Sequence, residues 1–232
     1  MIVFAIGGTS SLARIILDDL SKKYKIYTTY NSHKPPQKLL KKKINFFKLN
    51  IGDPNKKNLI KTIIKKNSLE KKKIILLNFS VYKKNELFIN ENENNINYNL
   101  DINIKFHIEL VKIFLPIMIK KKYGRIIHFS SSKAIYGEVG TCLYSATKTF
   151  LNGFSSSIAK EYGKFNVTSN ILSLGYFKSK LWNNISSKIQ NERIKDVPSK
   201  KLGSIKNISN AIELLINSDY INRSTIKIDG GI

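Results

Sequence analysis

The chain contains very little cysteine and no long apolar run. Its one cysteine, Cys142, excludes a disulfide framework and a cysteine-based metal cluster. A reducing, cytoplasmic compartment is the expectation for such a chain. No apolar run reaches the roughly 18 residues that a membrane span needs, and the opening apolar residues meet Gly7 too early for a secretory signal. These absences predict a soluble cytoplasmic protein without a membrane partner.

Histidine is also scarce, which bears on metal binding. The chain has 3 histidines, and His107 has no second histidine at metal-site spacing. His128 lies in an apolar, strand-like run, where a hydrogen-bonded core histidine is more typical than a metal ligand. We therefore expect no metal site.

Acidic residues and arginine are few, although the chain is strongly basic. Lysine and arginine total 40 against 16 acidic residues, and the net charge is +24. Only four of the basic residues are arginines, whereas specific nucleic-acid recognition favours the planar arginine fork. Because the lysines accompany abundant asparagine and isoleucine, a compositional bias explains the charge better than a polyanion site. We expect no nucleic-acid partner.

Short apolar runs alternate with helical patterns along all 232 residues, which suits one domain spanning residues 1–232. Helices are expected at residues 14–20, 54–66 with Asp53 as N-cap and Pro54 at the first position, 101–120, 149–162 and 208–216. Residues 86–99 read as a polar loop or short helix. Such alternation predicts an α/β fold with one parallel sheet covered on both faces. Strands are expected at residues 2–6, 25–30, 44–49, 74–77, 125–129, 166–172 and 224–228.

A loop of small residues follows the first expected strand. Residues 7–13 read Gly-Gly-Thr-Ser-Ser-Leu-Ala and lead into a helical pattern. The N-terminus of a helix offers N–H groups and a positive dipole end to a phosphate. Taken alone, the pattern is more typical of a plain tight turn, because Ser11 and Ala13 stand where glycines are expected.

The second expected strand is followed by polar and basic residues. Nucleotide sites that select NAD usually carry an acidic residue about 20 positions after the glycine loop. None occurs between Leu20 and Asp53. Hydroxyl, imidazole and ammonium groups suited to an extra phosphate stand there instead, which favours NADP(H) over NAD(H), with an ordinary polar turn as the alternative. These residues are Asn31, Ser32, His33 and Lys34.

Residues 130–148 combine three groups that can act on a carbonyl. Tyr144 and Lys148 are four apart, so on a helix they share a face. The hydroxyl of Ser131 and its serine neighbours follow an apolar strand, at the edge where open α/β sheets bind ligands. We expect these groups to converge on a small molecule and reduce a carbonyl. Cys142 is expected in a pocket wall.

Four motifs in order resemble those of the short-chain dehydrogenase/reductase family. Residues 144–148 match its Y-x-x-x-K signature, and Ser131 lies thirteen residues before the tyrosine. Asn103 matches an asparagine of the preceding helix, thirteen residues before Pro116. Pro116 belongs to the fourth motif, and beyond these four the ending at residues 228–231, Ile-Asp-Gly-Gly, resembles the family's V-D-G-G ending. The resemblance implies a single Rossmann-like, doubly wound domain of about seven parallel strands, resembling 3-oxoacyl-carrier-protein reductases.

The resemblance also implies roles for the matching residues. Tyr144 would be the general acid, Ser131 would bind the carbonyl oxygen, Lys148 would lower the tyrosine pKa and bind the ribose, and Asn103 would hold a relay water. NADP(H)-binding residues would be Gly7, Thr9, Ser10, Ser11, Leu12, Asn31, Ser32, His33, Lys34, Asn50, Ile51, Asn78, Phe79, Ser80, Tyr144, Lys148, Gly175 and Ser179.

The leading prediction is an NADPH-dependent carbonyl reductase or alcohol dehydrogenase. Its substrate would be a 3-oxoacyl thioester, including one presented on an acidic carrier protein, or a sugar or other small alcohol. Residues 175–202 lack a strong period and are expected to form a substrate lid. A homodimer or homotetramer is expected from the resemblance. The alternatives are a catalytically weak cofactor-sensing or scaffold protein and a polyanion-binding protein.

Overall fold

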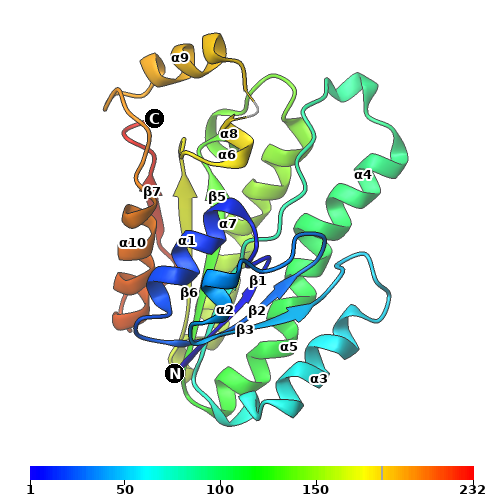
Figure 1. Ribbon diagram of the computed structural model, residues 1–232, viewed down its shortest axis with the longest axis vertical. Coiled ribbons are helices and arrows are strands. Elements are labelled where there is room, and N and C mark those ends of the chain that lie inside the picture. The colour runs from blue at the N-terminus through cyan, green and yellow to red at the C-terminus, as the bar shows by residue number, and fades with distance from the viewer. Residues whose placement is uncertain (184) are drawn as a thin grey trace.

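The computed structural model describes residues 1–183 and 185–232, and its centre is one parallel sheet of seven strands. The strand order β3-β2-β1-β4-β5-β6-β7 is the doubly wound arrangement (Figure 1). The predicted fold class is thereby confirmed. The strands are β1 Ile2–Ile6, β2 Lys25–Tyr30, β3 Ile44–Lys48, β4 Ile74–Asn78, β5 Gly124–Ser131, β6 Val167–Leu174 and β7 Thr225–Ile228.

Helices cover both faces of this sheet. Helices α1 Ser11–Leu20 and α10 Ile205–Asn217 lie on one face, and α3 Lys56–Lys66, α5 Phe106–Lys120 and α7 Cys142–Tyr162 lie on the other. No helix among the described residues has the length and apolarity to cross a membrane. The shorter elements are α2 Gln37–Leu40, η1 Leu69–Lys71, η2 Phe88–Asn90, α4 Glu93–Leu100, η3 Asp101–Lys105, α6 Lys133–Tyr136, η4 Gly163–Phe165, α8 Lys180–Asn183 and α9 Ser187–Asp196.

The central strands form where the chain has uninterrupted apolar runs. All five residues of β1 and all five of β4 are buried. A parallel sheet with helices on both faces buries both sides of each inner strand, so alternation with polar residues is not needed. The edge strand β7 instead alternates exposed and half-buried residues.

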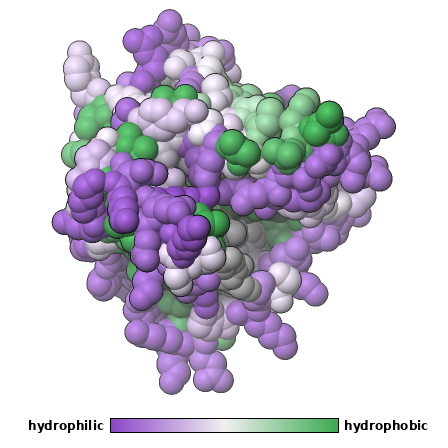
Figure 2. Space-filling view, turned by 90° about the horizontal axis from the view of Figure 1, so that it is seen from above, coloured by the Kyte–Doolittle hydropathy of each residue, from purple (hydrophilic) through white to green (hydrophobic). Residues whose placement is uncertain are grey.

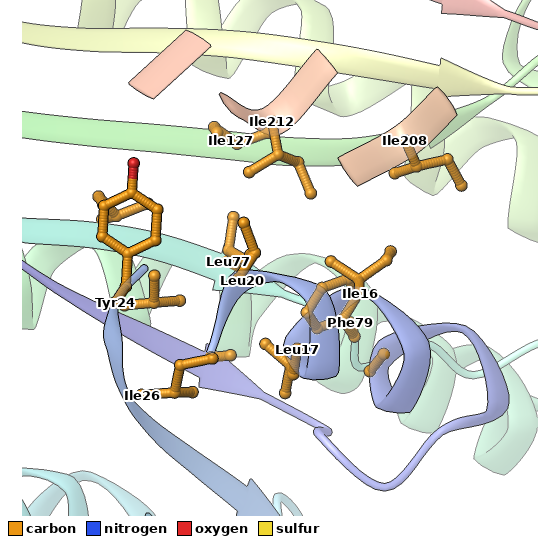
Figure 3. Packing of buried hydrophobic residues seen from close by; sticks show 14 of the residues in the cluster. Ile16, Leu17, Leu20, Tyr24, Ile26, Leu77, Phe79, Ile127, Ile208 and Ile212 are labelled. Atoms are coloured by element: carbon orange, nitrogen blue, oxygen red, sulfur yellow. The ribbon is translucent and has the colours of Figure 1, made fainter. Parts of the chain in front are cut away.

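The hydrophobic core on the α1 side of the sheet holds the first helix in place. Ile16 and Leu17 of α1 and Ile208 and Ile212 of α10 are fully buried, and they pack over the β4 residue Leu77 (Figure 3). Each such side chain contributes about 1.5–3 kcal/mol by leaving water. This packing holds the N-terminal end of α1 beside the carboxyl end of β1.

Several predicted helix starts were wrong. Helix α1 begins at Ser11 instead of Arg14, and α10 begins at Ile205 instead of Ile208. Helix α3 begins at Lys56 instead of Pro54, because the carboxylate of Asp53 accepts the N–H of Asn55 at 2.8 Å and closes a local turn. Helix α7 begins at Cys142, seven residues before the expected Thr149. The earlier start places both Tyr144 and Lys148 inside the helix.

The expected helix over residues 101–120 is interrupted at its beginning. Residues Asp101–Lys105 form a π-helical turn between α4 and α5. The polar residues 86–99 hold η2 and most of α4. A π-turn inside a helix is frequent at functional sites, and this one carries Asn103.

The segment at residues 175–202 contains helices where irregular chain was expected. It holds α8 and α9, and residue 184 of the expected lid lies outside the described residues. In Figure 1 both helices lie at the end of the molecule where β5 and β6 finish. The substrate lid expected over residues 175–202 stays a prediction.

Candidate active site

A cavity of about 620 Å³ lies at the carboxyl ends of the strands, next to the reversal of strand order between β1 and β4. Open α/β sheets bind ligands at this place. Lys34 and Asn103 are predicted site residues that do not line it, and Cys142, which was expected in its wall, is exposed and does not line it either. The predicted residues in its wall are Gly7, Thr9, Ser10, Ser11, Leu12, Asn31, Ser32, His33, Asn50, Ile51, Asn78, Phe79, Ser80, Ser131, Tyr144, Lys148, Gly175 and Ser179.

The loop after β1 is built for close approach of a ligand to the backbone. Gly7 adopts a φ of +75°, and its N–H donates to the hydroxyl of Thr29 at 3.2 Å. A side chain on Gly8 would lie 2.2 Å from the Thr28 hydroxyl oxygen. The side chain of Ser10 caps α1 by accepting the N–H of Ala13. These features fit a pyrophosphate at the N-terminus of α1.

The residues after β2 form the polar end of the cavity. Ser32 and His33 hydrogen-bond to each other at 3.1 Å between Oγ and Nδ1, and both are exposed. A second, adjacent hollow shares Ser11 and is also lined by Arg14 and Lys38. Sequence reasoning missed these two basic residues, because neither belongs to the strand-end pattern that points to the site.

Ser131, Tyr144 and Lys148 come together at the other end of the cavity. The ammonium of Lys148 lies 5.7 Å from the centre of the Tyr144 ring and donates to the carbonyl oxygen of Phe129 at 2.9 Å. The hydroxyl of Ser131 hydrogen-bonds the Tyr144 phenol. One strand end and one helix face thus direct a hydroxyl, a phenol and an ammonium at the same space.

Burial dominates the protonation of both α7 groups. It raises the pKa of the Tyr144 phenol, and the hydrogen bond from Ser131 opposes this rise. It lowers the pKa of the Lys148 ammonium to about 8. The expected lowering of the tyrosine pKa is therefore not seen in the protein alone, because desolvation of the phenolate exceeds the hydrogen-bond contribution.

Asn103 lies beside the cavity and holds the chain segment that follows β4. Its side-chain amide donates to the carbonyl oxygen of Tyr82 at 2.8 Å and to Asn99 at 2.9 Å, and its Oδ1 accepts the N–H of Tyr82 at 2.9 Å. Through these bonds the π-turn fixes the backbone next to Lys83. Its predicted role as holder of a relay water stays a prediction.

A buried hydrogen-bond chain runs from the cavity wall into the core. Asn78 binds Nδ1 of His107 at 2.9 Å, Nε2 of His107 binds Nδ1 of His128 at 2.7 Å, and Nε2 of His128 binds Ser169 at 2.8 Å. Ser169 then meets Ser155 of α7 at 2.9 Å. The chain ties β4, α5, β5, β6 and α7 together beneath the site.

The direction of this chain follows from its first member. Oδ1 of Asn78 accepts the N–H of Ser80 at 3.0 Å, so its NH₂ group must face His107. His107 then accepts at Nδ1 and donates from Nε2, and His128 does the same. Burial lowers the pKa of His128 to about 3 and that of His107 well below its usual value, so both rings are neutral.

Lys83 was not predicted as a site residue, although it lies against the candidate acid. Its ammonium is 5.2 Å from the centre of the Tyr144 ring. The residue stands in a polar stretch without a periodic pattern, so no local signal distinguishes it from the other lysines. Among the described residues, no cluster of histidine, cysteine and acidic side chains could hold a metal.

Comparisons with known proteins place the chain in a family. The short chain dehydrogenase family model matches residues 1–190. The chain is 31% identical to 3-oxoacyl-(acyl-carrier-protein) reductase FabG of Buchnera aphidicola subsp. Baizongia pistaciae, over 97% of this chain and 94% of the relative. The FabG of Haemophilus influenzae is 28% identical over 100% and 97%.

A solved structure has the same fold. ElxO with NADP bound superposes with a TM-score of 0.86 at 22% identity, covering 99% of this chain and 97% of that one. Residues 1–190 include the loop after β1 and all of α7, so the family match spans both ends of the cavity. The chain belongs to the short-chain dehydrogenase family and is an oxidoreductase acting on CH–OH and C=O groups.

Proposed function

We propose that the protein is an NADPH-dependent reductase of 3-oxoacyl thioesters, with Tyr144 as the general acid. The observation that carries this proposal is the convergence of Ser131, Tyr144 and Lys148 in the cavity that also contains the loop after β1. The relatives named 3-oxoacyl-(acyl-carrier-protein) reductase support the choice of substrate. A sugar or other small alcohol is the competing substrate class.

The residues divide between holding the cofactor and handling the carbonyl. The loop around Gly7 and the N-terminus of α1 would hold the pyrophosphate of NADP(H). The bound nicotinamide supplies the hydride in reduction. Ser131 and Tyr144 donate hydrogen bonds to the carbonyl oxygen, and the tyrosine proton moves to that oxygen as negative charge develops. The nearby Lys148 ammonium stabilises the phenolate that remains.

The basic surface supports a carrier protein as the source of the thioester. The net charge of +24 attracts an acidic partner and speeds its encounter. We further propose that the chain forms a homodimer or homotetramer through α5 and α7, and light scattering of the purified protein tests this.

Replacing the candidate acid tests the proposed reaction directly. Tyr144→Phe removes the transferable proton but keeps the ring, so turnover of acetoacetyl-CoA should fall at least about 100-fold. NADPH affinity, measured by quenching of protein fluorescence, should change little. Oxidation of NADPH followed by absorbance measures the turnover.

Tyr136 offers a matched control, because it is a half-exposed tyrosine of the neighbouring α6 whose hydroxyl donates to Ile232. Tyr136→Phe should retain turnover. Full activity of Tyr144→Phe would refute the mechanism. Tight NADPH binding by the wild-type protein without turnover of any carbonyl would favour a cofactor-sensing or scaffold protein.

A further inference from the structure

Three basic side chains from separate parts of the chain meet beside the candidate acid. Lys83 follows β4, Lys133 belongs to α6 and Arg193 belongs to α9. The Lys83 ammonium lies 5.2 Å from the centre of the Tyr144 ring, and its neighbours include Lys133 and Arg193. Only 9% of the Lys133 side chain and 18% of the Arg193 side chain are exposed.

The cluster carries more positive than negative charge. Glu138 forms ion pairs with both Lys133 and Arg193. Among the described residues, no carboxylate forms an ion pair with Lys83. Burial and the neighbouring cations lower the pKa of Lys133 to about 7, so Lys83 and Arg193 are the two firmly charged members of the cluster, and one carboxylate leaves at least one positive charge uncompensated.

The shared burial makes this arrangement unfavourable without an additional anion. Desolvation lowers the pKa of Lys83, the neighbouring Lys133 side chain opposes this, and the nearby Arg193 lowers it further. A carboxylate placed beside Lys83 would relieve the repulsion between the cations and gain charge-assisted hydrogen bonds. Because the cluster is largely withdrawn from water, it suits a small anion better than a nucleic-acid backbone.

We propose that the cluster is a substrate subsite for a carboxylate, held mainly by Lys83. The inference rests on the proposed function, because the subsite is placed relative to a carbonyl on Tyr144. The Lys83 ammonium lies against the Tyr144 ring, so a substrate that contacts both residues must carry its carbonyl and its carboxylate only a few bonds apart. A short free 3-oxo acid meets this condition, so the subsite adds such acids to the proposed 3-oxoacyl thioester substrates, with the carboxylate where the uncharged thioester group would lie.

Glu138 has a positioning role in this subsite. Its carboxylate forms ion pairs with Lys133 of α6 and with Arg193 of α9, so it links these two helices. Arg193 also lies 5.7 Å from the centre of the Tyr176 ring. These contacts hold Lys133 and Arg193 in place and leave Lys83 as the cation available to a substrate anion.

A pair of substrates that differ only in charge tests the subsite. Acetoacetate and its methyl ester present the same ketone to Tyr144, and NADPH oxidation measures kcat/KM for each. We expect the acid to be favoured at least about tenfold over the ester in the wild-type protein. Lys83→Gln should lower this acid-to-ester ratio at least about tenfold, as expected for loss of a desolvated ion pair.

Lys84 supplies the matched control. It is the next residue along the chain, is more exposed, and pairs with Glu86. Lys84→Gln should leave the acid-to-ester ratio unchanged. An equal preference for acid and ester in the wild-type protein overturns the subsite, as does a Lys83→Gln variant that slows both compounds by the same factor.

Binding of a product distinguishes failure of the subsite from failure of the proposed function. With NADP⁺ present, 3-hydroxybutyrate should raise the melting temperature of the wild-type protein more than its methyl ester does. Lys83→Gln should abolish this difference, and its absence in the wild-type protein overturns the subsite whether or not turnover occurs. Reduction of the methyl ester without preference for the acid overturns the subsite alone.

Discussion

Gly8 is a position where a single methyl group has no room. A Cβ at this position would lie 2.2 Å from Oγ1 and 2.8 Å from Cγ2 of Thr28. Thr28 cannot turn away freely, because it is buried and its hydroxyl donates to the carbonyl oxygen of Ala5 at 2.9 Å. The loop after β1 is therefore pressed against β2, which brings its N–H groups close to the cavity.

Gly8→Ala should lower stability by about 1–3 kcal/mol, the range for overpacking a filled site. Gly153 is the matched control, because it is exposed in the middle of α7 and a Cβ there meets no atom within 4 Å. Gly153→Ala should instead stabilise by about 0.5–1 kcal/mol through helix propensity. Urea unfolding of the three proteins measures both effects. Equal stability of wild type and Gly8→Ala would contradict the packing argument.

Under the proposed function, Arg14 is one of three basic residues of the hollow beside the cavity that would meet the extra phosphate of NADPH, with Lys38 and Lys178. It is exposed at the start of α1 and lines the hollow that shares Ser11 with the main cavity. Arg14→Gln should raise KM for NADPH at least about fivefold and leave KM for NADH nearly unchanged, because only NADPH carries that charge. Steady-state assays with both cofactors measure this. Equal effects on both cofactors would count against the assignment.

Single residues were predictable where a spacing is fixed by local geometry. The interval from Tyr144 to Lys148 is one helical turn, and the strand before Ser131 is a continuous apolar run, so both were placed from sequence. Lys83 and Arg193 were missed because their proximity to the site arises only from tertiary folding. No pattern in their local sequence distinguishes them from the many other lysines and arginines of the chain.

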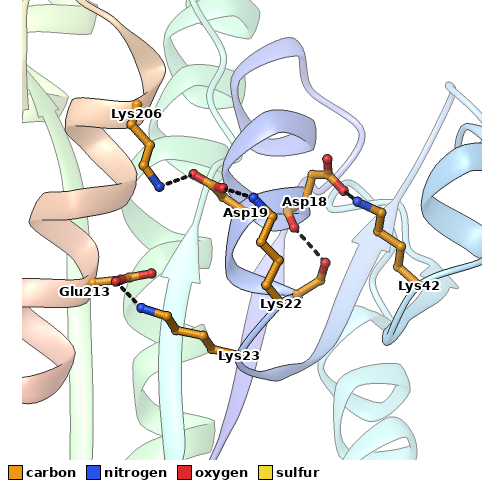
Figure 4. A network of polar contacts seen from close by, with 8 residues as sticks. Asp18, Asp19, Lys22, Lys23, Lys42, Lys206 and Glu213 are labelled. Atoms are coloured by element: carbon orange, nitrogen blue, oxygen red, sulfur yellow. Dashed lines mark hydrogen bonds and ion pairs between the residues drawn. The ribbon is translucent and has the colours of Figure 1, made fainter.

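Helices α1 and α10 are joined by charges as well as by their core. Asp19 accepts from Lys22 at 2.8 Å and from Lys206 of α10 at 3.0 Å, and Lys23 pairs with Glu213 at 2.6 Å (Figure 4). Hydrogen bonds from these lysines lower the pKa of Asp19 to about 2. Since the lysine ends are exposed, each pair adds little stability. The buried isoleucines and leucines between the helices carry most of the packing energy.

The histidine chain across five elements should make the fold sensitive to acid. In the native protein His107 and His128 are neutral because burial lowers the pKa of both, that of His128 to about 3. In the unfolded chain a histidine pKa is near ~6.5. Between these values the unfolded state binds more protons, so the free energy of unfolding must fall as the pH drops below about 6.5.

Two protons give a maximal slope of about 2.7 kcal/mol per pH unit between about pH 6 and 4.5. Urea unfolding at a series of pH values measures it. His128→Gln removes one of the two groups, so its slope should be about half as steep while its stability at pH 7.5 is lower. A wild-type stability that stays constant from pH 7.5 to 5 would contradict neutral, buried rings.

The strands and the long helices that cover the sheet were predictable from the sequence, but several starting points and the helices α8 and α9 were not. The seven strands follow from short apolar runs that a two-sided parallel sheet buries. The π-turn at Asp101–Lys105 has no sequence pattern, and the turn at Asp53 competes with the capping role that its sequence suggests. The π-turn depends on hydrogen bonds to a segment distant in the chain, between Asn103 and Tyr82, whereas the α3 start is decided by the local hydrogen bond of Asp53.

At the scale of the whole molecule, basic side chains greatly outnumber acidic ones. Hydrophilic side chains cover most of the face seen from above the strand ends, with apolar patches between them (Figure 2). With 40 basic and 16 acidic residues, most lysines cannot find a carboxylate partner. Mutual repulsion among them favours expansion of the chain and opposes folding.

Added salt should therefore stabilise this protein by screening the repulsion between its lysines, although salt usually weakens surface ion pairs. Raising KCl from 20 to 300 mM shortens the Debye length from roughly 20 Å to about 6 Å, which weakens repulsion between spaced lysines more than attraction within contact pairs. We expect the melting temperature at pH 7.5 to rise by several degrees, on the order of 1–2 kcal/mol for a chain of this size.

Chloride is the appropriate anion for this experiment, because sulfate and phosphate also strengthen apolar burial and would confound the result. Calorimetric scans at constant protein concentration keep the contribution of oligomerisation fixed. A variant with exposed lysines of α3 changed to glutamine, such as Lys61→Gln and Lys65→Gln, should show a smaller rise. A melting temperature that falls with KCl would mean that ion pairs such as those between α1 and α10 outweigh the general repulsion.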